Sequence, residues 1–246
     1  MKIKVCIANY GDTQLSYLYR IVEEFVSFKR HRLNIAIYTT EKLNIPYKQY
    51  SANISYKLYP ESIKKALPFA CREDMALAID DYDLFIYDEN DMLITENNVN
   101  TFLEHSAILP NGQVSGFIRY EINSEGKKVL LDPNPYWGEL TNSITQNSFC
   151  LNNLHQGSWI LLKKDLNTAI QSGGFVYFMH DTPYGILEQG ASDPYTQCKL
   201  RKIFPRNYSL CNNLLIHHLP NKYCRQFEWV KHGIDLSTLL EFCAKN

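Results

Sequence analysis

The order of apolar segments predicts an α/β fold with a mixed, mostly parallel sheet and helices on its faces. Alternating apolar and polar residues open the chain, a helical period follows, and further short apolar runs recur at strand–helix–strand intervals. With 246 residues the chain can bury a core without disulfides, and its 45% apolar and 21% charged residues exclude a disordered or fibrous protein.

Residues before position 105 predict the regular part of this sheet. Leu18, Ile21 and Phe25 fall on one face of a helix, and Pro68 interrupts a later one. The apolar run 84–87 is typical of a parallel strand that is covered on both faces. The expected elements are a strand at 3–7, a helix at 15–26, strands at 33–38 and 54–58, a helix at 61–79 and a strand at 84–87.

The second half, from residue 106, has a less regular pattern. We expect a hairpin of 114–122 and 129–131, an irregular loop at 132–157, a strand at 159–162, a helix from Asp165 to Gly174, a helix at 188–203, a strand at 214–219 and a helix at 236–243. The simplest account is a single domain over 1–246, divided into halves 1–105 and 106–246.

Charge and cysteine content exclude several classes of protein. The 25 basic and 26 acidic residues nearly cancel, so no nucleic-acid partner is expected. Seven cysteines without a C-x-x-C pair argue against a zinc ribbon or a disulfide scaffold and indicate reduced, buried thiols. The apolar runs are too short for a signal peptide or an integral membrane segment. We therefore expect a soluble, cytoplasmic protein.

An acidic segment ends the strand at 84–87. Three carboxylates, Asp88, Glu89 and Asp91, surround Asn90, and an apolar run follows at once. Ligands in open α/β sheets bind outside the carboxyl ends of the strands, where the loop at Asn9 also lies. Carboxylates gathered at one strand end need a compensating charge, and a hard divalent cation with oxygen ligands supplies it. The alternative is an acidic turn that faces water.

These segments together resemble a known enzyme family. Ile7-Ala8-Asn9-Tyr10-Gly11, the helix with Arg72, and the segment Tyr87–Asp91 are similar to GT-A fold glycosyltransferases over about residues 1–105. A more distant resemblance to the small GT-A transferases of large algal viruses extends further. In the family, an Asp-x-Asp-type motif binds a divalent cation on the nucleotide-sugar pyrophosphate. Asn90 departs from the local form Tyr-x-Glu-Asp-Asp, and Asp91 keeps its last acidic position.

The resemblance implies a Mn²⁺ or Mg²⁺ cofactor. Asp91, supported by Glu89, would bind the cation, and a histidine from the C-terminal part would complete its ligands. His218 is the first choice and His217 the second, because neighbouring residues of a strand point to opposite faces. A hydrogen-bonded core histidine is the competing interpretation.

The resemblance also implies a site for a nucleotide diphosphate sugar. Asn9 and Tyr10 would border the base or ribose, and Arg72 and Lys222 would approach the phosphates. Tyr10 is otherwise a partly buried loop tyrosine, and Arg72 is otherwise the partner of a nearby surface acid. A UDP-sugar is the favoured donor.

An inverting transferase needs a carboxylate base for the acceptor hydroxyl. Glu188 is the first candidate because it lies near a predicted helix start, and Asp181 is the second. Either could instead be a helix cap or a surface acid, which leaves a retaining mechanism open. Residues with the character of sugar-contacting groups, each with a core or hairpin alternative, are Arg119, His155, Gln156 and Trp159.

The sequence thus predicts transfer of a sugar to a hydroxyl acceptor on a glycan or a similar molecule. One alternative is a degenerate, non-catalytic carbohydrate- or nucleotide-binding protein on the same fold. The departure of Asn90 from the acidic motif is compatible with this alternative. A sugar nucleotidyltransferase would carry a Gly-rich basic loop after the first strand, and a Rossmann dehydrogenase would carry G-x-G-x-x-G there. Neither pattern follows Ala8.

Overall fold

A computed structural model describes residues 1–44, 53–133, 141–175, 181–226 and 233–245. The chain forms two compact units. Unit 1 comprises Met1–Met92 and Gly157–Leu200, and unit 2 comprises Leu93–Gln156 and Arg201–Asn246. This division differs from a boundary near residue 105, because the chain returns to unit 1 at Gly157 to add another strand to the first sheet.

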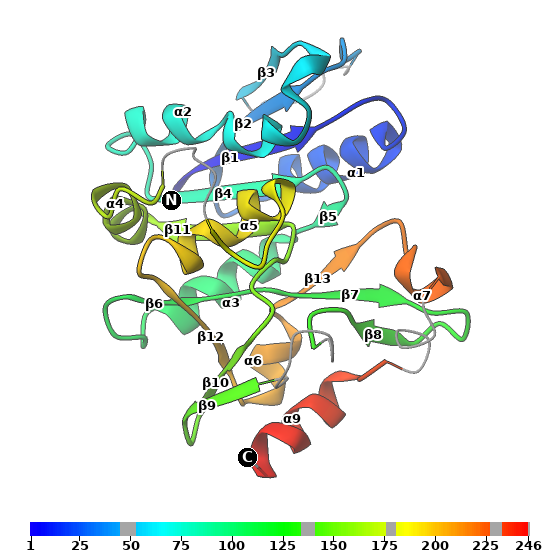
Figure 1. Ribbon diagram of the computed structural model, residues 1–246, viewed down its shortest axis with the longest axis vertical. Coiled ribbons are helices and arrows are strands. Elements are labelled where there is room, and N and C mark those ends of the chain that lie inside the picture. Colours follow the sequence, from blue (N-terminus) through cyan, green and yellow to red (C-terminus); the bar gives the residue numbers. More distant parts are fainter. Residues whose placement is uncertain (45–52, 134–140, 176–180, 227–232, 246) are drawn as a thin grey trace. The chain divides into compact units, whose positions relative to one another are not determined.

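Unit 1 is built on a five-stranded sheet in the order β11-β4-β1-β2-β3 (Figure 1). Its strands are β1 (Lys2–Asn9), β2 (Arg32–Thr39), β3 (Asn53–Leu58), β4 (Leu84–Glu89) and β11 (Ser158–Leu162). The pairs β1–β2, β1–β4 and β2–β3 are parallel, whereas β11 pairs antiparallel with β4. This confirms the predicted mixed, mostly parallel sheet.

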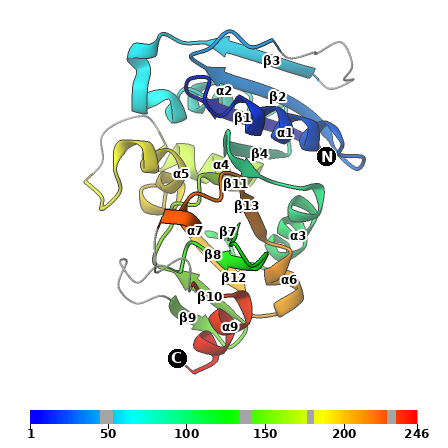
Figure 2. The ribbon, with the colours of Figure 1, turned by 90° about the vertical axis from the view of Figure 1, so that its right-hand side faces the viewer.

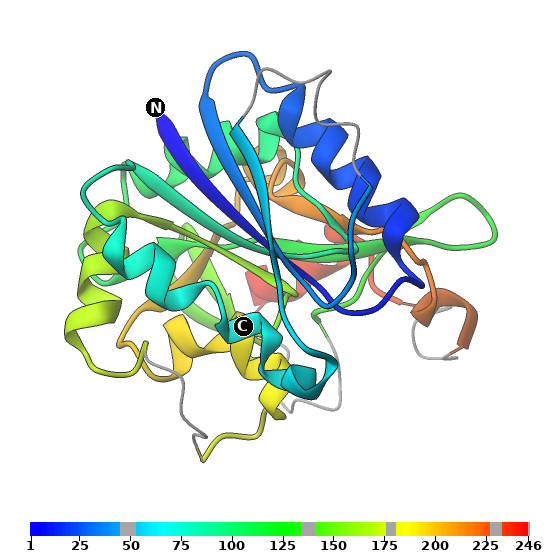
Figure 3. The same ribbon diagram turned by 90° about the horizontal axis from the view of Figure 1, so that it is seen from above.

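Helices cover both faces of that sheet. Helix α1 (Leu15–Val26) lies on one face, and α2 (Arg72–Leu77), α4 (Lys163–Gln171) and α5 (Ile186–Thr196) lie on the other (Figure 3). Helix α1 buries Leu18, Ile21, Val22 and Phe25, as its period predicts.

The helix expected over 61–79 is interrupted next to Pro68, as the sequence predicts, but its first part is not α-helical. The chain forms a 3₁₀ segment, η2 (Glu61–Phe69), and then the short helix α2. Lys64 inside η2 has φ 42° and ψ −124°, which is not helical backbone. Pro68 lacks the N–H that a continuous α-helix would need.

Unit 2 contains two smaller sheets. One has the order β5-β13-β7-β8, and the other has the order β6-β12-β10-β9. Their strands are β5 (Met92–Leu93, where unit 1 ends), β6 (Gln113–Ser115), β7 (Ile118–Ile122), β8 (Lys128–Leu130), β9 (Thr141–Thr145), β10 (Ser148–Leu151), β12 (Arg201–Pro205) and β13 (Leu215–His218). The hairpin of β7 and β8 confirms the prediction, and Gly126 has the left-handed φ of +76° that its turn requires.

The helices of unit 2 are α3 (Glu96–Ser106), α6 (Tyr208–Asn212), α7 (Tyr223–Gln226) and α9 (Leu236–Lys245). Thr95 and Asn98 form a capping box at the start of α3. Helix α9 lies beside β9 (Figure 2) and contributes Leu236, Leu239 and Cys243 to the hydrophobic core of unit 2.

Three expectations for the second half are wrong. The region 132–157 is not an irregular loop throughout, because β9 and β10 pair within it. The helix expected over 188–203 ends at Thr196, and the last part of that range belongs to β12, which pairs with β6 and β10. Asp165 lies inside the first turn of α4, where Leu162 is the N-cap.

All seven cysteines are buried thiols, as the sequence predicts. Within the ranges that the structure describes, no helix has both the length and the apolar character needed to cross a bilayer.

Candidate functional site

Three strands of unit 1 meet at the side chain of Asn9, at the carboxyl end of β1. Asn9 is fully buried, and its Nδ2 donates to Thr39 Oγ1 of β2 at 3.0 Å and to the Gly11 carbonyl at 3.1 Å. Its Oδ1 accepts a hydrogen bond from Asn90 Nδ2 at 2.6 Å. Asn9 therefore organises the loops at this end of the sheet.

Asn90 stands at the middle position of the acidic segment, where the resembling family has an acid. Its amide is a donor to Asn9 Oδ1, and the side chain is only 6% exposed. A carboxylate at this position would place two acceptor oxygens together. The contact with Asn9 thus gives a physical reason for the amide.

Three carboxylates lie at the carboxyl end of β4. Asp88 is fully buried, Asp91 is 7% exposed and Glu89 is half-buried. Gln14 Nε2 donates to Asp91 Oδ2 at 3.1 Å. Neither oxygen of Asp88 makes a hydrogen bond of ordinary geometry with any residue in the described part of the chain.

The electrostatics of Asp88 suit a bound cation. Burial, followed by the charges of Asp91 and Glu89, raises the pKa of Asp88 well above its ordinary value, and the Glu89 backbone N–H opposes this weakly. An oxygen-only, negatively charged donor set is the kind that Mg²⁺ and Mn²⁺ prefer. As placed, no three His, Cys, Asp or Glu side chains of the described ranges are grouped closely enough to hold an ion together.

Asp88→Asn is expected to change the pH dependence of stability in the metal-free protein. Because the folded-state pKa is raised, the folded protein keeps a proton that the unfolded chain loses, so Asp88 destabilises the fold increasingly as pH rises above about 4. Urea unfolding of both proteins in chelator between about pH 4 and 8 should therefore show the Asn variant gaining relative stability with rising pH.

The matched control is Asp12→Asn, which removes an exposed carboxylate of unit 1. If the Asp88→Asn and wild-type stability curves stayed parallel over this pH range, the raised pKa of Asp88 would be ruled out.

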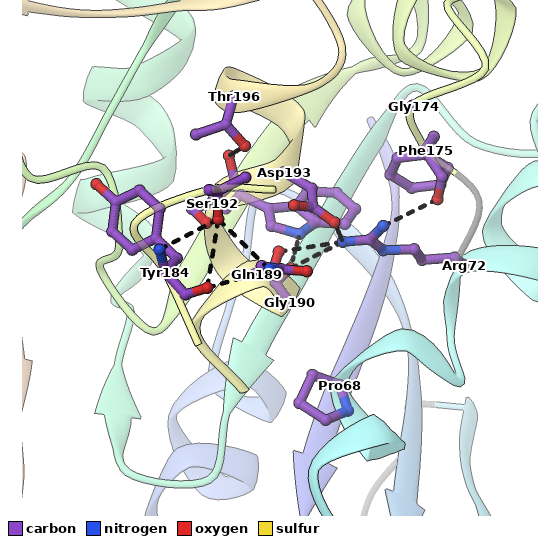
Figure 4. A network of polar contacts seen from close by, with 12 residues as sticks. Pro68, Arg72, Gly174, Phe175, Tyr184, Gln189, Gly190, Ser192, Asp193 and Thr196 are labelled. Atoms are coloured by element: carbon purple, nitrogen blue, oxygen red, sulfur yellow. Dashed lines mark hydrogen bonds and ion pairs between the residues drawn. The ribbon is translucent and has the colours of Figure 1, made fainter. Parts of the chain in front are cut away.

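Arg72 is buried in a polar network with α5 (Figure 4). Its Nη2 forms an ion pair with Asp193 Oδ2 at 3.0 Å and donates to the carbonyls of Gln189 and Gly190, while Nη1 donates to the Phe175 carbonyl at 3.0 Å. The sequence interpretation offered phosphate or a nearby surface acid as the partner. The partner in the structure is a fully buried acid 121 positions away.

Helix α5 carries the predicted base at its first turn. Glu188 is half-buried, and its Oε2 accepts the Gly185 N–H at 2.8 Å in a capping arrangement. Asp181, the second candidate, is exposed and precedes the helix. The capping geometry agrees with the helix-cap alternative for Glu188, and a half-buried carboxylate at a helix N-terminus can also accept a proton.

Trp159 and Tyr10 differ sharply in exposure. Trp159 lies in the core of unit 1, where it stacks on Tyr87 with ring centroids 5.8 Å apart and donates to the Gly190 carbonyl at 3.2 Å. Tyr10, after β1, is 50% exposed. Of these two aromatic candidates, only Tyr10 presents a ring to solvent.

In unit 2, His218 lies against Glu121. His218 Nδ1 is 2.5 Å from Glu121 Oε1, and Glu121 Oε2 accepts the Cys224 N–H at 2.6 Å. Burial raises the pKa of Glu121, but the hydrogen bonds from His218 and from Cys224 hold it below its ordinary value. Lys222 of the same region lies over the Tyr223 ring at 5.1 Å.

The sugar-contacting candidates of unit 2 belong to a buried polar cluster. Arg119 binds Asp132 with Nε at 2.9 Å and Nη2 at 2.9 Å from Oδ1. Lys202 Nζ bonds Gln156 Oε1 and the Leu154 carbonyl, and burial lowers the pKa of Lys202 well below its ordinary value. Arg119 and Gln156 therefore have protein partners.

His155, the fourth of these candidates, is half-buried beside Gln156. Its backbone N–H donates to Asn153 Oδ1 at 3.1 Å. The predicted residues thus fall into two sets. Unit 1 holds Asn9, Tyr10, Arg72, Glu89, Asp91, Trp159, Asp181 and Glu188, and unit 2 holds Arg119, His155, Gln156, His218 and Lys222.

Sequence reasoning missed the burial of Asp88 and the roles of two further buried acids, Asp193 and Glu121. Asp88 was part of the recognised acidic segment, but only the pairing of β4 between β1 and β11 shows that it is buried. Asp193 and Glu121 meet Arg72 and His218 across 121 and 97 positions, and no local pattern marks such pairs.

Comparison with known proteins adds a likeness of fold at low similarity. No family model matches the chain, and no curated protein matches it. The chain is similar to two crystal structures of S. aureus TarS 1-349, one of them in complex with UDP-GlcNAc. Each is 10% identical, has a TM-score of 0.43 and covers 89% of this chain.

The match covers 58% and 56% of the two TarS chains, so this chain spans a little over half of their length. A likeness at this level carries no argument about function, which has to come from the site itself.

Proposed function

We propose that this chain is a metal-dependent glycosyltransferase that moves a sugar from a nucleotide diphosphate sugar, in first place a UDP-sugar, to a hydroxyl acceptor on a glycan or a similar molecule. One observation carries the proposal. Three carboxylates, one of them fully buried without an ordinary hydrogen-bond partner in the described chain, end the buried strand β4 next to the carboxyl end of β1.

Asp91 and Glu89 would bind the cation, and a bound cation would favour the ionised form of the buried Asp88. A Mn²⁺ or Mg²⁺ ion held there would neutralise the charge that develops on the leaving nucleotide diphosphate. The hydrogen bonds among Asn90, Asn9 and Thr39 support the proposal, because they hold the acidic segment against the neighbouring strands.

The nucleotide would lie at the carboxyl end of β1. Tyr10 has the exposed ring that stacking on a base requires, and the buried Asn9 would position the loop that carries it. Because Arg72 already pairs with Asp193, we assign phosphate compensation chiefly to the cation. Arg72 would support the site through α5.

Glu188 remains the proposed base, with Asp181 second. In a direct displacement, the carboxylate takes the proton of the acceptor hydroxyl while that oxygen bonds the anomeric carbon and the nucleotide diphosphate leaves with the electron pair of the C–O bond. The configuration at the sugar then inverts. Glu188 can accept that proton only if its capping bond to the Gly185 N–H leaves the second oxygen to the acceptor.

Calorimetric titration with UDP, GDP, dTDP and CDP, each with and without Mn²⁺, tests the proposal. We expect Mn²⁺-dependent binding, tightest for UDP, that Asp91→Ala abolishes because a carboxylate ligand is lost. Asp81→Ala, which removes an exposed acid before the opposite end of β4, is the matched control and should bind as the wild type does.

Two results would contradict the proposal. If no nucleotide bound under any condition, the transferase would be rejected. Binding that did not depend on Mn²⁺ or on Asp91 would favour the non-catalytic nucleotide-binding alternative.

A further inference from the structure

A cavity of about 630 Å³ lies in unit 1, where parts of η2, α2 and α4 line it. Its volume falls within the range of sites that hold small molecules. Asn9, Tyr10 and the acidic segment at 88–91 do not line it, so its lining differs from that of the proposed nucleotide and cation site. The lining is mostly aromatic or aliphatic and includes Tyr59, Ile63, Phe69, Arg72, Ile170 and Phe175.

Arg72 is the buried cation of this lining. Its Cζ lies 4.3 Å from the ring centroid of Phe69 and 5.2 Å from that of Phe175, which stands beside the guanidinium in Figure 4. Both rings also line the cavity. The guanidinium is therefore packed into the aromatic lining and does not extend into solvent.

One donor of Arg72 has no acceptor in the described part of the chain. The Nη atoms bond Asp193 and three carbonyls, whereas Nε has no hydrogen-bond partner although the side chain is only 4% exposed. A buried N–H without an acceptor costs about 1–3 kcal/mol. Because almost all buried polar groups in proteins have a partner, this donor indicates an acceptor that the chain itself does not supply.

The charges around the cavity favour a neutral ligand. Arg72 is already compensated by Asp193, so an anion would lose its hydration without meeting an unpaired cation. The exposed Glu73, which also lines the cavity, would repel an anion further. An ammonium group carries donors only and could not satisfy Nε, so a carbonyl or hydroxyl oxygen is the acceptor that fits.

We propose that this cavity binds a neutral, largely apolar ring compound, which packs on the aromatic lining and accepts a hydrogen bond from Arg72 Nε through a carbonyl or hydroxyl oxygen. The aromatic side chains of the lining provide the surface on which such a ring packs favourably. This inference goes beyond the proposed function and depends on neither metal nor nucleotide binding. It concerns unit 1 alone.

Two naphthalene probes of different charge test the cavity by fluorescence titration of the full-length protein. Prodan is a neutral naphthyl ketone, whereas anilinonaphthalene sulfonate is an anion. We expect one prodan molecule to bind, and the sulfonate to bind at least about tenfold more weakly because no unpaired cation meets it. Absence of prodan binding, or equal or tighter binding of the sulfonate, would overturn the proposal.

The variant Ala76→Phe tests where the probe binds. Ala76 lines the cavity from α2, so a phenyl ring there fills part of it, and we expect prodan affinity to fall at least about tenfold. Ala78→Phe is the matched control, since Ala78 is the C-cap of the same helix and does not line the cavity. Two folded variants that bind prodan equally well would place the probe elsewhere and overturn the proposal.

The hydrogen bond can be tested in the wild type, without a variant that has to fold. In ¹⁵N-arginine-labelled protein, we expect prodan to move the Nε–H proton signal of Arg72 to higher frequency, because this N–H gains an acceptor. If the signal stayed in place while prodan was bound, Arg72 Nε would not be the donor to the ligand.

Competition separates this cavity from the nucleotide site. Prodan affinity should be unchanged in the presence of UDP and Mn²⁺. Displacement of prodan by UDP would make the cavity a part of the nucleotide site and would overturn the inference. Failure of UDP to bind would reject the proposed function and leave the inference standing.

Discussion

Arg72→Met is expected to lower the free energy of unfolding by about 3–5 kcal/mol, because it leaves a buried charge without its partner. Asp193 is fully buried and pairs with Arg72 Nη2 at 3.0 Å. The carbonyls of Phe175, Gln189 and Gly190 each lose the hydrogen bond from Arg72 in the same substitution, although Gly190 keeps the one from Trp159. Urea unfolding followed by circular dichroism measures the loss.

A surface pair of the same unit provides the control for Arg72. Lys163 pairs with Asp80 at 2.7 Å, but their side chains are 46% and 88% exposed, so Lys163→Met should cost at most about 1 kcal/mol. The double variant Arg72→Met/Asp193→Asn should recover part of the lost free energy of unfolding, because it also removes the carboxylate charge that Arg72→Met leaves unpaired. Equal effects of Arg72→Met and Lys163→Met would show that the buried network does not stabilise unit 1.

Gly190→Ala is expected to destabilise unit 1 by about 1–3 kcal/mol, although alanine is the better helix former by about 1 kcal/mol. A Cβ on Gly190 would lie 2.4 Å from Pro68 Cβ and 3.5 Å from the Tyr87 hydroxyl. The proline ring cannot rotate away, so α5 or η2 has to shift. Thermal or urea unfolding of the variant measures the cost.

Gly185→Ala is the matched control at the start of the same helix. There a Cβ meets only Glu188 Oε2, at 3.6 Å, which is ordinary contact, so the cost should stay below about 1 kcal/mol. A shift of α5 would also move the Gly190 carbonyl away from Arg72 and Trp159. We therefore expect Gly190→Ala and Arg72→Met to combine non-additively, and simple additivity would argue against this coupling.

Much of unit 1 follows from local pattern. The strands β1, β2 and β4 and the helix α1 were expected close to their observed positions, because a parallel sheet with flanking helices imposes strong, distinct hydrophobic periods. Unit 2 was harder to predict, because its short strands β9, β10 and β12 carry weak periods.

The acidic segment after β4 could be recognised from residue order alone, since carboxylates beside a continuous apolar run stand out locally. The roles of its individual residues could not be predicted from residue order. Whether Asp88 is buried, or why Asn90 is an amide, depends on strands that are distant in the sequence.

The amino-acid sequence alone therefore determined the α/β class, the buried thiols and the acidic strand end, because these depend on composition and on periods within a few residues. The tertiary structure alone decided that Arg72 pairs with Asp193 and that Glu121, rather than solvent, faces His218. A buried charge must find its partner wherever the chain places one. The partner is set by contacts between residues about a hundred positions apart in the sequence. A local pattern of residue types does not indicate such contacts.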